Sequence, residues 1–133
     1  MITPGFCNQA KLEMVRALVN GDLRVALYTK DAQLDPQTSA YTPLGEVKGD
    51  GYAAGGKPVV SSVGLSGDTA WLDLDDLVWE GATFTARGAM VYAAARQNAA
   101  IVVLDFGRDF SASDGRFVLI WPAPGTQAII RVP

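Results

Sequence analysis

The spacing of apolar residues changes once along the chain, from a helical period near its beginning to a strand period in the remainder. From Phe6 to Val19, apolar residues recur every three or four positions, which predicts an amphipathic helix. Thr3 before Pro4 is a helix-start signal, and Asn20-Gly21 is a stop signal. Residues 1–21 are therefore expected to form an arm and a helix that packs on a sheet; the alternative is an arm that docks on a neighbouring subunit. Cys7 is expected to be a buried or half-buried apolar side chain.

Alternation of apolar and polar residues predicts strands over most of the remaining sequence. Leu23, Val25 and Leu27 mark residues 22–30 as the first core strand. A long strand is expected over residues 69–79, where the alternation slips at Asp75-Asp76 as a β-bulge would cause. The other expected strands are residues 58–65, two short segments of residues 82–94 that bend at Gly88, residues 100–106 as a central strand covered on both faces, residues 116–121 and residues 126–132, with a polar loop over residues 107–115.

The number and spacing of these segments define the expected fold class. About seven to eight strands follow one another with turn-forming residues between them. No helix separates one strand from the next, so a parallel sheet with a nucleotide crevice is not expected. The sequence predicts one mainly β domain over residues 1–133, an antiparallel β-sandwich or a jelly-roll-like barrel with one N-terminal α-helix.

Residues 31–50 show neither the helical nor the strand pattern, although they are punctuated by proline and glycine. A loop of this length is uncommon in a small domain and usually has a role. Two interpretations stay open, a surface crossing between two sheets and an extended contact loop anchored by Leu34, Tyr41 and Leu44.

A glycine-rich run over residues 45–60 contains a partial match to a phosphate-binding loop. Gly51, Gly56 and Lys57 satisfy the first seven positions of G-x-x-x-x-G-K-[ST]. Pro58 stands where Ser or Thr is required, and no buried strand or helix flanks the run as that loop requires. The run is therefore interpreted as a set of turns that lead into the sheet, and Lys57 as a surface residue. The turn positions are Gly49, Gly51, Gly55 and Gly56.

Composition narrows the chemistry that this domain can perform. The chain has no histidine and one cysteine, which excludes a Cys/His zinc site, an internal disulfide and a Ser-His or Cys-His nucleophile pair. A net charge of −3 with scattered Lys and Arg argues against a nucleic-acid partner. No apolar run is long enough to span a bilayer, so no membrane partner is expected. A mean hydropathy of +0.15 is high for a soluble domain and indicates that a partner covers some apolar surface.

Carboxylates and aromatic residues along the predicted strands could in principle form three kinds of site, a glycosidase acid/base pair, a calcium site or a carbohydrate groove, and none of the three is favoured. Asp73, Asp75, Asp76 and Glu80 invite comparison with a glycosidase acid/base pair or a calcium site, but they match neither pattern and are interpreted as a solvated strand face. The aromatic side chains are interpreted as core rather than as a carbohydrate groove. They are Trp71, Trp79, Phe84, Tyr92, Phe106, Phe117 and Trp121.

Six short segments form an ordered set along the chain. They are Leu23–Thr29 (LRVALYT), Tyr41–Val47 (YTPLGEV), Gly49–Lys57 (GDGYAAGGK), Ala86–Ala89 (ARGA) with Tyr92, Val103–Gly107 (VLDFG) and Ala128–Arg131 (AIIR). The set, which covers almost the whole chain, resembles a family of small structural proteins of tailed bacteriophages. The resemblance implies a non-enzymatic virion protein, made in the host bacterial cytoplasm, that has no catalytic residues and no cofactor.

The resemblance further implies a capsid decoration or cement protein whose partners are the major capsid protein and copies of itself in a homo-oligomer. A tail, connector or fibre-associated component is the alternative role within a virion. Two alternatives come from other classes. A groove lined by two or more exposed Trp or Tyr side chains would favour a carbohydrate-binding β-sandwich, and two carboxylates converging in a pocket would favour a small hydrolase.

The expected contact residues are apolar side chains that no predicted strand or helix buries. They lie in residues 1–6, in the loop of residues 31–44 and in the turn of residues 122–125. We expect the interface to contain Ile2, Phe6, Leu34, Tyr41, Leu44, Pro122 and Pro124. Deletion of residues 33–42 is expected to leave a folded protein that no longer joins particles.

Overall fold

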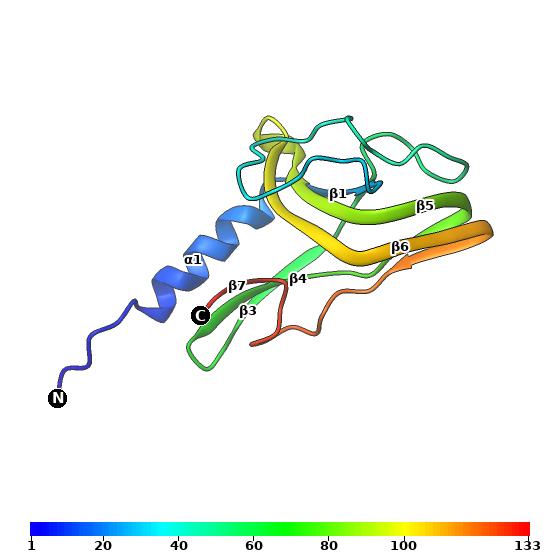
Figure 1. Ribbon diagram of the computed structural model, residues 1–133. Coiled ribbons are helices and arrows are strands. Elements are labelled where there is room, and N and C mark those ends of the chain that lie inside the picture. Colours follow the sequence, from blue (N-terminus) through cyan, green and yellow to red (C-terminus); the bar gives the residue numbers. More distant parts are fainter.

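The computed structural model describes all 133 residues as one α-helix, one short 3-10 helix and seven strands. In chain order the elements are α1 Asn8–Val19, β1 Leu23–Tyr28, β2 Lys57–Pro58, β3 Ser61–Ser66, β4 Thr69–Leu74, β5 Leu77–Ala93, η1 Ala94–Arg96, β6 Ala99–Leu119 and β7 Ile130–Val132. The strands form two antiparallel sheets, one in the order β2-β1-β5-β6 and the other in the order β3-β4-β7 (Figure 1). The mainly β, antiparallel prediction with one N-terminal helix is confirmed. The sheets do not close, so the barrel alternative is wrong.

Helix α1 begins later than the sequence predicts. Residues 1–6 have no regular structure, and Cys7 is the extended N-cap residue with φ −71° and ψ 141°. A turn of helix around Pro4 and Gly5 would have nothing to pack against, and short helical turns are unstable without packing. Cys7 is exposed, so the prediction that it is buried or half-buried is wrong.

The helix contacts the β3–β4 hairpin through one apolar stripe and one buried lysine. Leu12 and Val15 enter the core, while Lys11 is 7% exposed and donates from Nζ to the Asp68 carbonyl at 2.8 Å. Asn8 donates to the Asp68 carboxylate at 3.0 Å. These contacts fix the helix on the hairpin turn and leave the preceding residues pointing away from the domain.

The phase slip at Asp75-Asp76 marks a passage between sheets rather than a bulge within one strand. Strand β4 belongs to the three-stranded sheet, and β5 belongs to the four-stranded sheet. The Trp121 indole Nε1 donates to the Asp75 carbonyl at 2.9 Å, and the Trp121 backbone N–H donates to the Asp76 carboxylate at 3.2 Å. The predicted return of Leu77 and Trp79 to the core is confirmed, since both are buried.

Strands β5 and β6 form one long, bent hairpin, which corrects three predictions. Residues 82–93 belong to a single strand, with a register shift between Ala86 and Gly88 among others, instead of two short strands, and Ala94 begins η1. Residues 107–115 continue β6 instead of forming a polar loop. Strand β6 lies at the sheet edge, so residues 100–106 do not form a central strand; all are half-buried except Asp105, which is exposed. Within residues 107–115, β5 pairs with Phe110, Ser111, Ala112 and Gly115, while most side chains of this segment are exposed to solvent.

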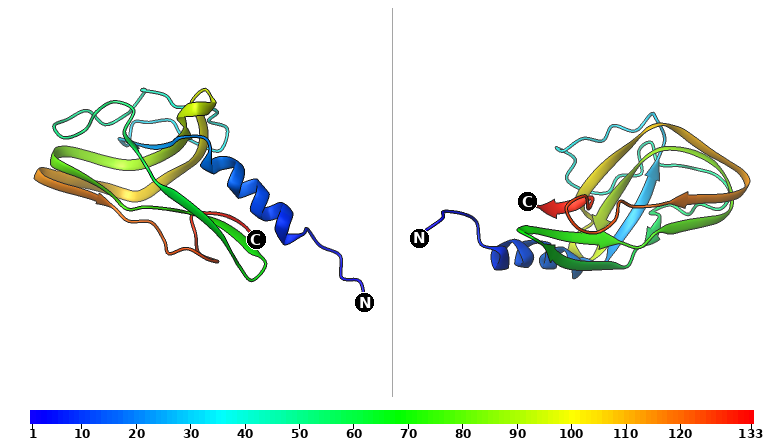
Figure 2. Two further views of the ribbon diagram at one scale, coloured as in Figure 1. Left: turned by 180° about the vertical axis from the view of Figure 1, so that it is seen from behind. Right: turned by 90° about the horizontal axis from the view of Figure 1, so that it is seen from below.

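The main core contains 21 buried residues from both sheets and the helix. A second, smaller core lies on the other face of β1 and β5, where Ala26, Tyr28, Met90 and Tyr92 are buried. The chain between β1 and β2 covers this face (Figure 2). Strand β1 is therefore covered on both sides. Most of the predicted core aromatics are buried, while Trp71 and Phe106 are half-buried.

Candidate functional site

A buried carboxylate holds the long loop against the sheet. Glu46 is 5% exposed and accepts hydrogen bonds from the Tyr41 hydroxyl at 2.6 Å, the Tyr52 hydroxyl at 2.5 Å and the Gly55 N–H at 2.8 Å. None of the ion pairs in the structure involves it. A buried carboxylate without a cation is stabilised only by hydrogen-bond donors. The three donors here satisfy most of the capacity of the Glu46 carboxylate to accept hydrogen bonds.

All four tyrosines of the chain take part in this arrangement. Besides the two that donate to Glu46, Tyr28 donates to the Thr42 carbonyl at 2.6 Å and Tyr92 donates to the Gly55 carbonyl at 2.5 Å. The rings of Tyr41 and Tyr92 stack with centroids 4.9 Å apart. We call Glu46 and the four tyrosines the loop lock, because they tie both halves of the loop to strands β1 and β5.

The loop lock predicts a loss of stability at high pH. Burial raises the pKa of Tyr28 from 10.0 to about 12, with a further contribution from the negative charge of Glu46. Burial, and then the hydrogen bond to Glu46, also raise the pKa values of Tyr41 and Tyr52. Raised pKa values stabilise the folded state below the unfolded pKa, and that stabilisation is lost as the pH rises through the folded pKa. We expect the free energy of unfolding to fall progressively above about pH 10.

Urea unfolding at a series of pH values from about 8 to about 11 measures this effect. The variant Tyr52→Phe removes one of the three raised groups, so its stability is expected to fall less steeply with pH than that of the wild type. Equal slopes in the two proteins would contradict the assignment.

The partial phosphate-binding motif forms no phosphate site. Lys57 lies in β2, donates from Nζ to the Val78 carbonyl and lies 5.5 Å from the centre of the Trp79 ring. It is half-buried and held by these contacts, rather than free on the surface as expected. Gly56 packs against the backbone of Val25. The turn interpretation of the glycines is supported by positive φ angles at Gly51, Gly55 and Gly56.

The four carboxylates of the long predicted strand do not converge. Asp75 and Asp76 lie at the passage between the sheets, and Glu80 pairs with Arg116 at 3.2 Å across the β5–β6 hairpin. Asp73 is half-buried on β4. No group of three or more Asp, Glu, Cys or His side chains is close enough to hold a metal ion. The feature that would favour a hydrolase, two carboxylates in one pocket, is not found among these residues.

The residues expected at an interface fall into two groups. Leu34 and Tyr41 pack inside the domain, against the core formed around Tyr28 and Met90. The other five are exposed at three separate places, the arm, the loop tip and the turn after β6. They are Ile2, Phe6, Leu44, Pro122 and Pro124. Because Tyr41 belongs to the loop lock, deletion of residues 33–42 would unlock the loop, so it is not a clean test of contact.

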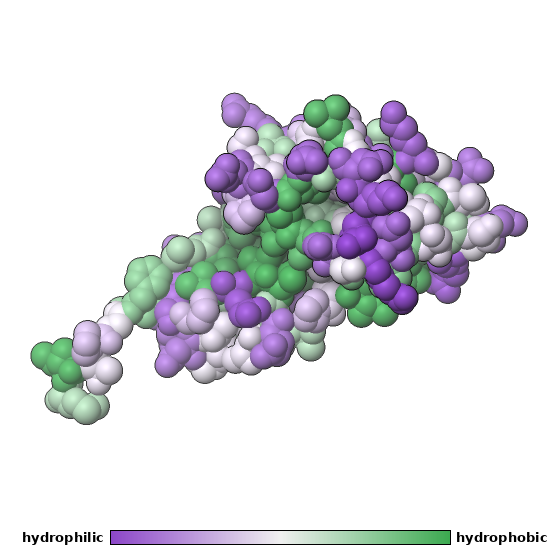
Figure 3. All heavy atoms as spheres, in the orientation of Figure 1, coloured by the Kyte–Doolittle hydropathy of each residue, from purple (hydrophilic) through white to green (hydrophobic).

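Sequence reasoning missed an apolar groove along the free edge of β6. The groove has a volume of about 380 Å³, and Phe110, Val118 and Ile120 expose 38%, 45% and 70% of their surfaces there. We call it the β6 groove. It is lined by Phe106, Phe110, Ser111, Arg116, Phe117, Val118, Leu119 and Ile120. Figure 3 shows a further apolar area beside α1, on the face of the molecule seen in Figure 1.

Comparison with protein-family models, with curated proteins and with solved structures found no match. No helix is long and apolar enough to cross a membrane. The candidate site has two parts. The first is the loop held by the loop lock on one face, and the second is the set of exposed apolar side chains on the arm, the loop tip and the β6 edge.

Proposed function

We propose that the protein is a non-enzymatic structural protein of a tailed-phage virion. In this proposal, a β-sandwich-like domain decorates or cements the capsid through contacts with the major capsid protein and with copies of itself. The observation that carries the proposal is the exposure of large apolar side chains outside the core, of which Phe110, Val118 and Ile120 are grouped along the β6 groove. Large apolar side chains grouped on a surface are typical of protein contact sites.

The segments that resemble phage structural proteins have structural roles in this chain. They contain every residue of the loop lock, as well as Gly56 and the Arg87–Asp105 ion pair, whose closest atoms are 3.3 Å apart. The contacts that these residues make hold elements of the fold together. This supports a protein whose shared features specify a shape for assembly.

The carbohydrate-binding alternative lacks its diagnostic feature. Trp79 and Trp121 are buried in the main core, and the four tyrosines are engaged in the loop lock. Trp71 is half-buried on β4, where its indole Nε1 donates to the Ser66 hydroxyl at 3.1 Å. These aromatic side chains do not form an exposed sugar-stacking groove.

Quantitative mass spectrometry of purified particles tests the proposal, with the major capsid protein and a tail protein as internal standards. We expect a copy number that scales with the capsid lattice, because decoration repeats a modest contact at every equivalent position. A copy number equal to that of one tail ring would support the tail or connector alternative instead. Absence from washed particles would contradict a virion role.

A further inference from the structure

Residues Met1–Phe6, here called the arm, have no partner within their own chain. They make no hydrogen bond with the rest of the chain and belong to neither hydrophobic core. The arm has no charged side chain, and Ile2 and Phe6 are 94% and 58% exposed. In an extended chain Ile2, Pro4 and Phe6 point to one side, because side chains alternate with a period of two. The arm therefore offers one continuous apolar side.

The β6 groove offers the complementary surface. A cavity of roughly 150 Å³ holds a benzene ring, so the groove of about 380 Å³ has room for two apolar side chains. The consecutive residues 116–120 all line it, and neighbours on a strand point to opposite faces, so the groove follows the strand edge. This edge of β6 has no neighbouring strand, which leaves backbone groups available to an added strand.

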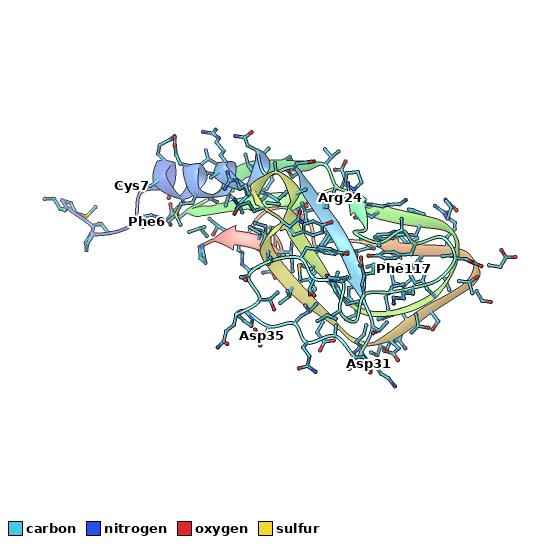
Figure 4. The ribbon with its side chains drawn as sticks, turned by 90° about the horizontal axis from the view of Figure 1, so that it is seen from above. Phe6, Cys7, Arg24, Asp31, Asp35 and Phe117 are labelled. Carbon is cyan, nitrogen blue, oxygen red and sulfur yellow. The ribbon has the colours of Figure 1, made fainter.

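The arm points away from the groove of its own chain. Figure 4 shows Phe6 and Cys7 at one end of the molecule and Phe117, which lines the groove, in the opposite half. Figures 1 and 2 show the arm continuing outward beyond α1. The occupant that fits is therefore the arm of another molecule of the same chain.

We propose that the arm of one copy docks in the β6 groove of a second copy, with Ile2 and Phe6 against its apolar lining. Arg116 is already paired with Glu80 at 3.2 Å, so docking leaves no unpaired charge in the groove. Pro4 has no backbone N–H to donate, and a strand added at the edge of a sheet tolerates a proline. The two contacting surfaces differ and lie in opposite halves, so this head-to-tail contact closes into a ring where the rotation permits. The inference rests on the self-association part of the proposed function.

Photo-crosslinking of the purified full chain tests the contact directly. Phe6→p-benzoylphenylalanine places an aromatic photoreactive group in the arm, and a mixture of isotope-labelled and unlabelled chains identifies links between copies. We expect covalent dimers in which residue 6 is joined to a tryptic peptide that carries groove residues of the other copy, which is Gln97–Arg108, Asp109–Arg116 or Phe117–Arg131. The same probe at the exposed helix position Glu13 is expected to give no such product. Links confined to other peptides would overturn the proposal.

Matched surface substitutions test the energetic role of the same residues. Ile120→Ser alters the groove at a side chain that is 70% exposed, and Val60→Ser alters a side chain 68% exposed outside it. Phe6→Ser alters the arm. We expect Phe6→Ser and Ile120→Ser each to weaken self-association at least about tenfold in sedimentation equilibrium, because each removes apolar burial from the contact. Val60→Ser is expected to leave the association unchanged.

All three variants are expected to keep the thermal midpoint of the monomeric domain, since these side chains lie outside the core. A wild-type chain that stays monomeric, or equal effects of Ile120→Ser and Val60→Ser, would overturn the arm contact. These results are separate from the particle measurement. If the chain is monomeric but abundant in virions, the arm contact is wrong and the proposed function stands. If the chain forms rings through the arm but is absent from virions, the arm contact stands and the proposed function is wrong.

Discussion

Glu46→Ala is expected to destabilise the domain by about 3–5 kcal/mol, a loss of about 10–20 °C in Tm. The substitution removes the acceptor shared by the hydroxyls of Tyr41 and Tyr52 and by the N–H of Gly55. Three donors are then left at a site that is closed to solvent, and each unsatisfied buried donor carries a desolvation penalty. The loop is expected to detach from β1 and β5 and to expose the core around Met90.

Chemical denaturation of matched variants measures this effect. Glu46→Gln keeps an oxygen acceptor and is expected to cost about 2 kcal/mol. Glu13→Ala removes an exposed glutamate of α1 and is expected to change stability by less than about 0.5 kcal/mol. Hydrogen exchange of the Leu27 N–H, which donates to the Tyr52 hydroxyl at 2.9 Å, reports the detachment locally. A Glu46→Ala protein as stable as Glu13→Ala would show that the loop lock does not hold the loop.

Gly56→Ala is expected to destabilise the domain by at least about 3 kcal/mol, because it combines two penalties. The Gly56 φ of +77° is unfavourable for alanine by about 1–2 kcal/mol. A Cβ at this position would lie 1.8 Å from the Val25 carbonyl oxygen, so the β1–β2 pairing would have to separate. Overpacking of this kind costs about 1–3 kcal/mol more.

Gly67→Ala is the matched control for this collision. Gly67 has a φ of +59°, and an added Cβ would meet nothing within 4 Å. Its substitution is expected to cost only the conformational penalty of about 1–2 kcal/mol. If the two alanine variants lose equal stability in urea unfolding, the close approach of Gly56 to β1 is not the reason that this position requires glycine.

The local patterns that could be predicted were those whose cause lies in neighbouring residues. The apolar stripe of α1, the alternation in β1 and the return of Leu77 and Trp79 to the core all follow from side-chain periodicity. The glycine-rich run was correctly interpreted as turns, because the residue after Lys57 is a proline.

Long-range pairing could not be predicted in the same way. Residues 107–115 have a polar, turn-like composition, yet they belong to a strand because β5 supplies backbone partners to Phe110, Ser111, Ala112 and Gly115. Residues 100–106 have the composition of a central strand, but the order of strands in the sheet places them at an edge. The passage at Asp75-Asp76 depends on Trp121, which is distant in sequence.

The loop lock illustrates why a site formed by residues distant in sequence cannot be predicted from the sequence alone. Glu46 stands among turn residues, and the four tyrosines are spread from residue 28 to residue 92. Nothing in their spacing shows that they meet. The partial clue was the glycine- and tyrosine-containing sequence of Tyr41–Val47 and Gly49–Lys57, which carry much of the loop lock. The structure shows that Tyr41 is half-buried and packs against the core around Tyr28 and Met90, which its place in a loop did not predict.

The most direct test of a capsid-cementing role is a cryo-electron microscopy reconstruction of purified particles at side-chain resolution. The proposal predicts density for this chain at repeated positions of the capsid lattice, with Ile2, Phe6 and Leu44 covered by the major capsid protein or by neighbouring copies. It also predicts that the loop lock is retained within each copy. A capsid lattice without this chain, or a bound chain whose arm and β6 groove both face solvent, would contradict it.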